Sequence, residues 1–146
     1  MRVDLYTQAR ADQFQRMARD MHAESWFSGW PLDMDRLMRF VCTPGVFCAL
    51  AVNDQSRAVG LIVGNPGDFV FSPVRVADLQ LLYVDPVHRG GRAAVLLLHA
   101  FEQWARGMGL HEVHLSQRTG VAVDDTARFF RSMGYRLIGS NAAKGL

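Results

Sequence analysis

The sequence predicts an α/β fold, of the α+β kind with a mixed sheet, whose elements follow the order β-α-α-β-β-β-α-β-α-β. Two observations predict it. Apolar residues recur at helical spacing between Thr7 and Ser25 and between Leu32 and Val41, and they change to short continuous runs from Val46 onward, which marks a change from helices to buried strands. Later, the pair Gly90-Gly91 separates a long apolar strand from an apolar helix that precedes another strand. Such a strand–helix–strand unit implies a right-handed crossover.

The N-terminal third combines one strand with two helices. Met1–Tyr6 alternates weakly between polar and apolar residues and is predicted to be a strand. Thr7–Ser25 has helical spacing. Trp26–Pro31 interrupts that helix, and Leu32–Val41 forms a shorter one that ends before Pro44-Gly45.

The middle of the chain is predicted to form three strands. Val46–Val52 is continuously apolar, and the turn residues Asn53–Ser56 separate it from Ala58–Val63, so the two form a hairpin. Asn65–Asp68 contains Pro and Gly and is predicted to be a second turn. The longer strand Val74–Val84 follows.

The C-terminal part alternates helices and strands. Arg92–Arg106 has an apolar stripe at helical spacing and ends at glycines. His111–Ser116 is predicted to be a strand, Asp124–Met133 a helix and Gly134–Ser140 a final strand.

Composition excludes several classes of protein. A chain of 146 residues can bury one core, so we expect a single domain over residues 1–146. The hydrophobic content of 49% argues against disorder, and the longest apolar run has seven residues, too few for a membrane span. Charges near the start do not fit a signal peptide, which predicts a cytoplasmic protein. The net charge of +2 gives no argument for nucleic acid, and the two cysteines form no CxxC motif that would indicate a metal site.

The most informative segment is the glycine-containing loop between the long strand and the next helix. Gly90 and Gly91 precede the helix N-terminus, where unpaired N–H groups and the helix dipole favour an anion. Arg89 and Arg92 add positive charge, so a phosphate or pyrophosphate is the expected ligand. The loop has neither the Gly-Lys-Ser/Thr of a P-loop nor the spacing of a dinucleotide-binding fingerprint. A plain tight turn before a helix is the alternative.

Two motifs carry a family resemblance. The segments Leu82–Pro86 and His88–Ala94 resemble the acetyl-coenzyme A loop of the GNAT superfamily of N-acetyltransferases, whose pattern is V-x-P-x-x-R/Q-x-x-G-x-G/A. Ala127–Tyr135 is similar to the A-x-x-F-Y-x-x-x-G-F/Y motif near the C-terminus of that superfamily. Arg92 departs from the pattern because it stands where the central glycine is expected. The RGGRA form resembles a branch of the superfamily found in phages and proteobacteria.

The resemblance implies that the donor is acetyl-CoA. Its pantetheine would pair with the end of the long strand, and its pyrophosphate would bind the N–H groups of the loop. The resemblance implies contacts with Leu82, Tyr83, Val84, Arg89, Gly90, Gly91, Arg92, Ala93, Ala94 and Phe130. A backbone N–H near Leu82 would stabilise the oxyanion, an effect of roughly 3 kcal/mol.

The resemblance also suggests catalytic residues. A base must deprotonate the acceptor amine, and Asp78 occupies a strand position where some members carry a glutamate. Glu24 is the other candidate base. Alternatively, Asp78 is a solvated strand-edge carboxylate and Glu24 a helix-end charge. The tyrosine that often protonates the thiolate is replaced by Phe130, which leaves Tyr83 as a weak candidate acid.

The resemblance therefore predicts an N-acetyltransferase that moves acetyl from acetyl-CoA to a primary amine by direct attack in a ternary complex, without a metal. A non-catalytic acyl-CoA-binding sensor or subunit is the alternative. The acceptor, a small molecule or a peptide, is not specified, and the superfamily often forms homodimers. Neither nucleic acid nor membrane is an expected partner. Trp26, Phe27 and Trp30 could line a pocket or form an oligomer contact.

Overall fold

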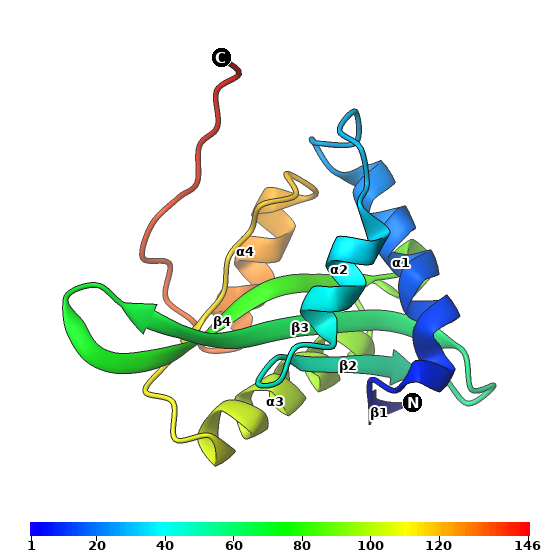
Figure 1. Cartoon of the computed structure of the whole chain (residues 1–146), viewed down its shortest axis with the longest axis horizontal. Helices are drawn as coiled ribbons and strands as arrows, with labels where there is room; N and C mark the ends of the chain where they lie inside the picture. The colour runs from blue at the N-terminus through cyan, green and yellow to red at the C-terminus, as the bar shows by residue number, and fades with distance from the viewer.

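The protein is described here by a computed structural model that covers all 146 residues. A five-stranded sheet lies between helices on both of its faces (Figure 1). The strands are β1 Arg2–Leu5, β2 Phe47–Val52, β3 Ala58–Phe69, β4 Ser72–Val84 and β5 Val113–His114. The helices are α1 Ala11–Glu24, α2 Met34–Val41, α3 Arg92–Gly107 and α4 Val123–Ser132, with short 3₁₀ turns at Gln8–Arg10 and Pro86–His88.

The sheet has the order β1-β2-β3-β4-β5. The first four strands form an antiparallel meander, which confirms the predicted β2–β3 hairpin. β5 pairs with β4 in parallel, through Ala77 opposite Val113 and Asp78 opposite His114. The predicted strand–helix–strand unit is therefore present as β4–α3–β5, and the mixed α/β fold class is confirmed.

The continuous apolar sequence of β2 is explained by burial on both faces. Successive strand residues point to opposite sides of the sheet. The side that packs against α3 carries Phe47, Ala49 and Ala51, and the side that packs against α1 and α2 carries Cys48, Leu50 and Val52. Because helices cover both sides, the strand needs apolar residues at every position.

The helices carry matching apolar stripes. In α1, Phe14 and Met17 are fully buried against the sheet, and each contributes about 1.5–3 kcal/mol of hydrophobic stabilisation. Asp33 is the N-cap residue of α2, and its side chain accepts a hydrogen bond from the N–H of Arg36 (2.9 Å). On the opposite face, α3 buries Phe101, and α4 adds Phe130 to the same core.

A bulge divides β4. Val63 of β3 lies opposite Leu81, but the next residue, Gly64, lies opposite Leu79, so Gln80 is an extra residue. Before the bulge, Leu79 faces α3; after it, Leu82 packs on that face. The bulge therefore shifts the alternation of β4 by one residue.

The predicted turn at Asn65–Asp68 is wrong. These residues continue β3, which ends only at Phe69, and the β3–β4 hairpin projects beyond the other strands (Figure 1). β2 stops pairing with β3 at Gly64. Beyond that point β3 has a free edge, and a sheet edge is where Pro66 is tolerated.

The predicted final strand, Gly134–Ser140, is also wrong, and the predicted strand His111–Ser116 is shorter, with only Val113–His114 in the sheet. Gly134 adopts a φ of +90° and ends α4, and the N–H of Tyr135 returns to the carbonyl of Phe130 (3.0 Å). The following Ile138 is 72% exposed, and residues 136–146 make no hydrogen bond between backbone groups. The segment extends away from the body of the molecule (red in Figure 1).

We expect Gly64→Ala to destabilise the fold by about 2 kcal/mol. A Cβ at Gly64 would meet the ring of Phe101 and would lie 2.8 Å from the backbone oxygen of Asp78. Gly29→Ala is the matched control, because nothing lies within 4 Å of its added Cβ. Urea unfolding of both variants measures the difference, and equal midpoints would contradict the close packing of Phe101 on β3.

Candidate active site

The C-terminal half of β4 has an open edge. On the side of β5, β4 is paired only at Ala77 and Asp78. From Leu79 to Val84, no strand binds this side, while β3 pairs with the other side. The two parallel strands therefore separate and leave backbone groups of β4 free to bind another extended chain.

The pairing with β3 identifies which groups point to the open edge. Gly60 lies opposite Val84. The N–H of Asp85 donates to the carbonyl of Val59 (2.8 Å). In an antiparallel ladder this pattern means that Val84 exchanges no bonds with Gly60, so its N–H and C=O point away from β3. In agreement, Nε of Arg89 donates to the carbonyl oxygen of Val84 (2.9 Å).

The same alternation shows the direction in which the backbone groups of Leu82 point. Leu82 lies opposite Ile62, two residues before Val84, so its backbone N–H also points to the open edge. Tyr83, between them, directs its side chain to the face covered by α1, where its ring is buried. The backbone N–H groups of Leu82 and Val84 thus point to the open edge of β4, whereas the side chain of Tyr83 points to the face covered by α1.

The loop after β4 leads directly to the N-terminus of α3. Gly90 adopts a φ of +75°, a conformation that favours glycine, and Gly91 is the N-cap residue. Because no side chain caps α3, its first N–H groups, from Arg92 to Ala94, have no partner from a capping residue. Arg92 is exposed and forms no ion pair, so the helix dipole and its guanidinium both favour an anion here.

Arg89 has different surroundings from Arg92, although the sequence predicts that both serve the donor phosphates. Its Nη2 lies 2.8 and 2.9 Å from the two carboxylate oxygens of Glu24. Its guanidinium also lies over the ring of Tyr83, 5.6 Å from the centroid. The structure thus joins two of the predicted catalytic residues, Glu24 and Tyr83, to Arg89.

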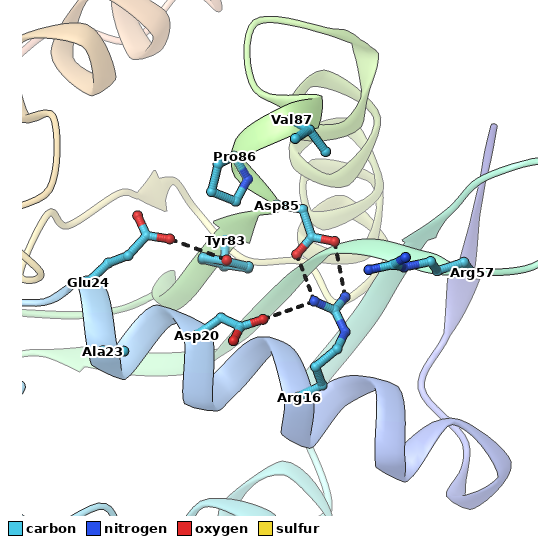
Figure 2. A pocket seen from close by; sticks show the side chains of 9 residues that line it. All are labelled: Arg16, Asp20, Ala23, Glu24, Arg57, Tyr83, Asp85, Pro86 and Val87. Carbon is cyan, nitrogen blue, oxygen red and sulfur yellow. Dashed lines mark hydrogen bonds and ion pairs between the residues drawn. The ribbon is translucent and has the colours of Figure 1, made fainter.

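The hydroxyl of Tyr83 donates to Oε1 of Glu24 at 3.3 Å (Figure 2). Burial raises the pKa of Tyr83 to about 12, and the carboxylates of Glu24, Asp85 and Asp20 contribute to this shift. The phenol therefore stays protonated near neutral pH and acts as a hydrogen-bond donor. Both oxygens of Glu24 are already engaged by protein groups.

Asp78 lies apart from this cluster. It lies five positions before Tyr83 on β4, which corresponds to roughly 15 Å along the strand. Its carboxylate lies over Gly67 of β3, where an added Cβ would collide with it, and it makes no side-chain hydrogen bond or ion pair. Asp78 is half-buried, at the point where β5 leaves β4.

Phe130 lies inside the core. It is 4% exposed, and its ring packs near those of Phe129 and Tyr135, at centroid distances of 6.0 and 6.4 Å. Tyr135 in turn donates its hydroxyl to Glu102 (2.7 Å). The contact of Phe130 with the donor stays a prediction.

A second charged cluster is not evident from the sequence. Asp85 is buried after β4, and Arg16 of α1 contacts both of its oxygens at 3.0 and 3.1 Å (Figure 2). The same guanidinium binds Asp20 and the carbonyl of Ala58. The only local signal for this cluster is that Asp85 directly follows a buried strand, because a buried carboxylate needs a cationic partner.

These groups line a cavity of about 450 Å³ between α1 and the turn after β4 (Figure 2). Its lining residues are Arg16, Asp20, Ala23, Glu24, Arg57, Tyr83, Asp85, Pro86 and Val87. The lining contains none of the residues Gly90–Ala94, so the cavity adjoins the donor loop without including the N-terminus of α3. No group of three or more His, Cys, Asp or Glu side chains is placed to hold a metal ion, and no helix is long and apolar enough to cross a membrane.

The sequence matches the acetyltransferase (GNAT) family over residues 15–135. Because this match covers most of the chain, the protein belongs to the GNAT family, whose members use acyl-CoA donors. It is therefore an N-acetyltransferase. No curated protein matches the sequence.

Solved structures with the same fold are distant in sequence. A Bacillus halodurans protein has 16% identity and a TM-score of 0.81, with all of both chains covered. An aminoglycoside 6'-N-acetyltransferase from Acinetobacter haemolyticus has 16% identity and a TM-score of 0.77, covering 100% of this chain and 98% of that one. A ribosomal-protein-alanine N-acetyltransferase from Brucella melitensis has 14% identity and a TM-score of 0.75, with both chains fully covered.

We expect Arg92→Ala to weaken the binding of acetyl-CoA about tenfold, because it removes the unpaired guanidinium beside the α3 N-terminus. Arg106→Ala, at the other end of the same helix, is the control and should leave the affinity unchanged. Calorimetric titration with acetyl-CoA measures both. Equal affinities of the two variants would mean that the phosphates bind elsewhere.

Proposed function

We propose that the protein transfers the acetyl group of acetyl-CoA to a primary amine by direct attack within a ternary complex. The observation that carries this proposal is the open edge of β4, which runs directly into the uncapped N-terminus of α3. An extended pantetheine needs free backbone groups, and a pyrophosphate needs unpaired N–H groups. The two features lie next to each other in the order that this donor requires.

The donor is proposed to bind in two parts. The pantetheine pairs with the backbone of Leu82 and Val84, whose polar groups point to the open edge. The pyrophosphate binds the N–H groups from Gly90 to Ala94, and Arg92 adds its charge. The N–H of Leu82 would then donate to the thioester oxygen, and a donor so placed stabilises the oxyanion by roughly 3 kcal/mol.

We favour Asp78 over Glu24 as the base. The carboxylate of Asp78 has no protein partner and lies where β5 leaves β4, whereas both oxygens of Glu24 are bound by Arg89 and Tyr83. Asp78 would accept a proton from the acceptor ammonium, directly or through water, and the neutral amine would attack the thioester carbon. In this scheme Glu24 holds α1 and the donor loop together.

Attack forms the C–N bond and gives a tetrahedral intermediate, whose nitrogen then loses its extra proton to water. Collapse of the intermediate re-forms the carbonyl group and breaks the C–S bond, whose electron pair leaves with sulfur as the CoA thiolate. The hydroxyl of Tyr83 is bonded to Glu24, and α4 carries Phe130 where a tyrosine is expected, so solvent is proposed to protonate the thiolate. Positioning and the oxyanion contact would then supply most of the rate.

An amine acceptor agrees with the solved structures of similar fold. One of them is named for acetylating an aminoglycoside at a 6'-nitrogen and another for acetylating an alanine of a ribosomal protein. Both names describe the transfer of an acetyl group to a nitrogen atom, but the acceptor molecule is an aminoglycoside in one and a protein in the other. The shared fold therefore supports the reaction type and leaves the acceptor to the residues around the site.

We expect Asp78→Asn to lower kcat by about 100-fold or more, because the amide cannot accept the amine proton. The dissociation constant of acetyl-CoA should not change. Asp68→Asn is the control, since Asp68 lies on the exposed β3–β4 hairpin and pairs only with Arg75 (3.1 Å). Release of the CoA thiol in the presence of an amine gives the rate.

The outcomes separate the alternatives. If Glu24→Gln abolishes turnover while Asp78→Asn retains it, Glu24 is the base. If the unaltered protein binds acetyl-CoA but transfers acetyl to none of a broad set of amines, the proposed reaction is wrong and an acyl-CoA-binding role replaces it.

A further inference from the structure

The loop between α1 and α2 exposes three packed aromatic side chains. Trp26, Phe27 and Trp30, which we call the aromatic triad, have ring centroids 4.9 to 6.1 Å apart. Trp26 is 53% exposed and Trp30 is 61% exposed. Tryptophan is on average highly buried in proteins, so a pair of half-exposed rings in a loop indicates a binding surface.

The triad is held in place although it is exposed. The backbone N–H of Trp26 donates to the carbonyl of Thr119 (2.9 Å), and its indole Nε1 donates to the carbonyl of Arg118 (2.7 Å). Gly120 lies close to the same ring, since a Cβ there would be 3.4 Å from it. An apolar surface fixed by hydrogen bonds before any ligand arrives loses little side-chain entropy on binding.

These bonds are one of two connections that tie the loop of the triad to the segments after β4 and β5. The first residue of the triad follows Glu24 closely, and Glu24 binds Arg89 in the loop after β4. Its partners, Thr119 and Arg118, belong to the segment that follows β5. Since β4 and β5 separate beyond Asp78, the loop that carries the triad is bonded, through Glu24 and Trp26, to segments on both sides of the gap.

The charges around the triad argue against a polycationic ligand. Glu24 is paired with Arg89. Arg118 is exposed and has no acidic partner. A second ammonium group of the acceptor beside Arg118 would therefore meet an unpaired positive charge.

We propose that the aromatic triad binds the apolar body of the acceptor, so that the enzyme prefers primary amines carrying an aromatic ring, of the arylalkylamine class, over polyamines and aminoglycosides. This inference rests on the proposed function, because it names the acceptor of that reaction. The ring of the acceptor stacks on Trp30 and Trp26, and its amine extends to the thioester. Edge-to-face and offset contacts of this kind favour an aromatic body over an aliphatic one.

The test compares three amines with acetyl-CoA as donor: 2-phenylethylamine, n-butylamine and spermidine. We expect kcat/KM for 2-phenylethylamine to exceed that for n-butylamine about tenfold. Trp30→Ala should remove most of this preference, since Trp30 makes no side-chain hydrogen bond that the fold needs. It should leave the affinity for acetyl-CoA unchanged and lower the rate with n-butylamine far less than the rate with 2-phenylethylamine.

Phe71→Ala is the matched control. Phe71 is 92% exposed at the tip of the β3–β4 hairpin, so its removal deletes an exposed ring away from the site. Trp26→Phe is a second variant of the triad that keeps a ring but loses the bond to Arg118. Equal rates with the two monoamines, a higher rate with spermidine, or equal loss in Trp30→Ala and Phe71→Ala would each overturn the inference.

Failure of the reaction itself is distinguishable. If no amine is acetylated although acetyl-CoA binds, the proposed function fails. The triad is then tested by quenching of tryptophan fluorescence in the CoA-bound protein. Quenching by 2-phenylethylamine that is lost in Trp30→Ala still supports an aromatic ligand, and its absence rejects one.

Discussion

The two-residue pairing between β4 and β5 is the feature on which the rest of the site depends. If β5 continued beside β4, the N–H and C=O groups of Leu82 and Val84 would be bound within the sheet. Because β5 ends at His114, these groups have no strand partner on this side; the carbonyl of Val84 accepts from Nε of Arg89, and the N–H groups of both residues stay available. Buried polar groups left without partners cost about 1–3 kcal/mol each, so such an edge is kept open only where a ligand or water satisfies it. The donor loop, the unpaired Asp78 and the aromatic triad are all arranged around this gap.

Two ion pairs join α1 to the loop that follows β4. Arg16 of the helix binds Asp85, and Glu24 at its end binds Arg89. The pairs run in opposite directions, since the helix supplies the cation in one and the anion in the other. They fix the helix both along its length and at its end, and the loop that carries Trp26 starts from that end. The position of the proposed acceptor surface thus depends on these two ion pairs.

Local signals in the sequence were sufficient for most elements and for the position of the glycine loop between β4 and α3. The glycines and arginines around Gly90 stand next to one another in the chain, so the prediction that they bind phosphate needed no knowledge of the fold. The partners of Arg16 and Arg89 could not, because 69 and 65 residues separate them from Asp85 and Glu24. Asn65–Asp68 has the composition of a turn, but the pairing of β3 with β4 overrides it. The last segment has the composition of a strand, but no strand beside it offers a partner. The choice of the general base and acid depends on which carboxylates are already bound by other protein groups, and the sequence composition does not show this.

The bulge at Gln80 has a consequence for how such an enzyme can diversify. It separates β4 into a first half, which carries Asp78 beside β5, and a second half, whose backbone faces the gap. The second half contributes main-chain atoms, which are the same for every amino acid, whereas the first half contributes a side chain. With the donor bound as proposed, substitutions in the first half and in the loop of Trp26 and Trp30 leave its backbone contacts in place. The register of a single strand would thus let the acceptor change while the donor site is inherited unchanged.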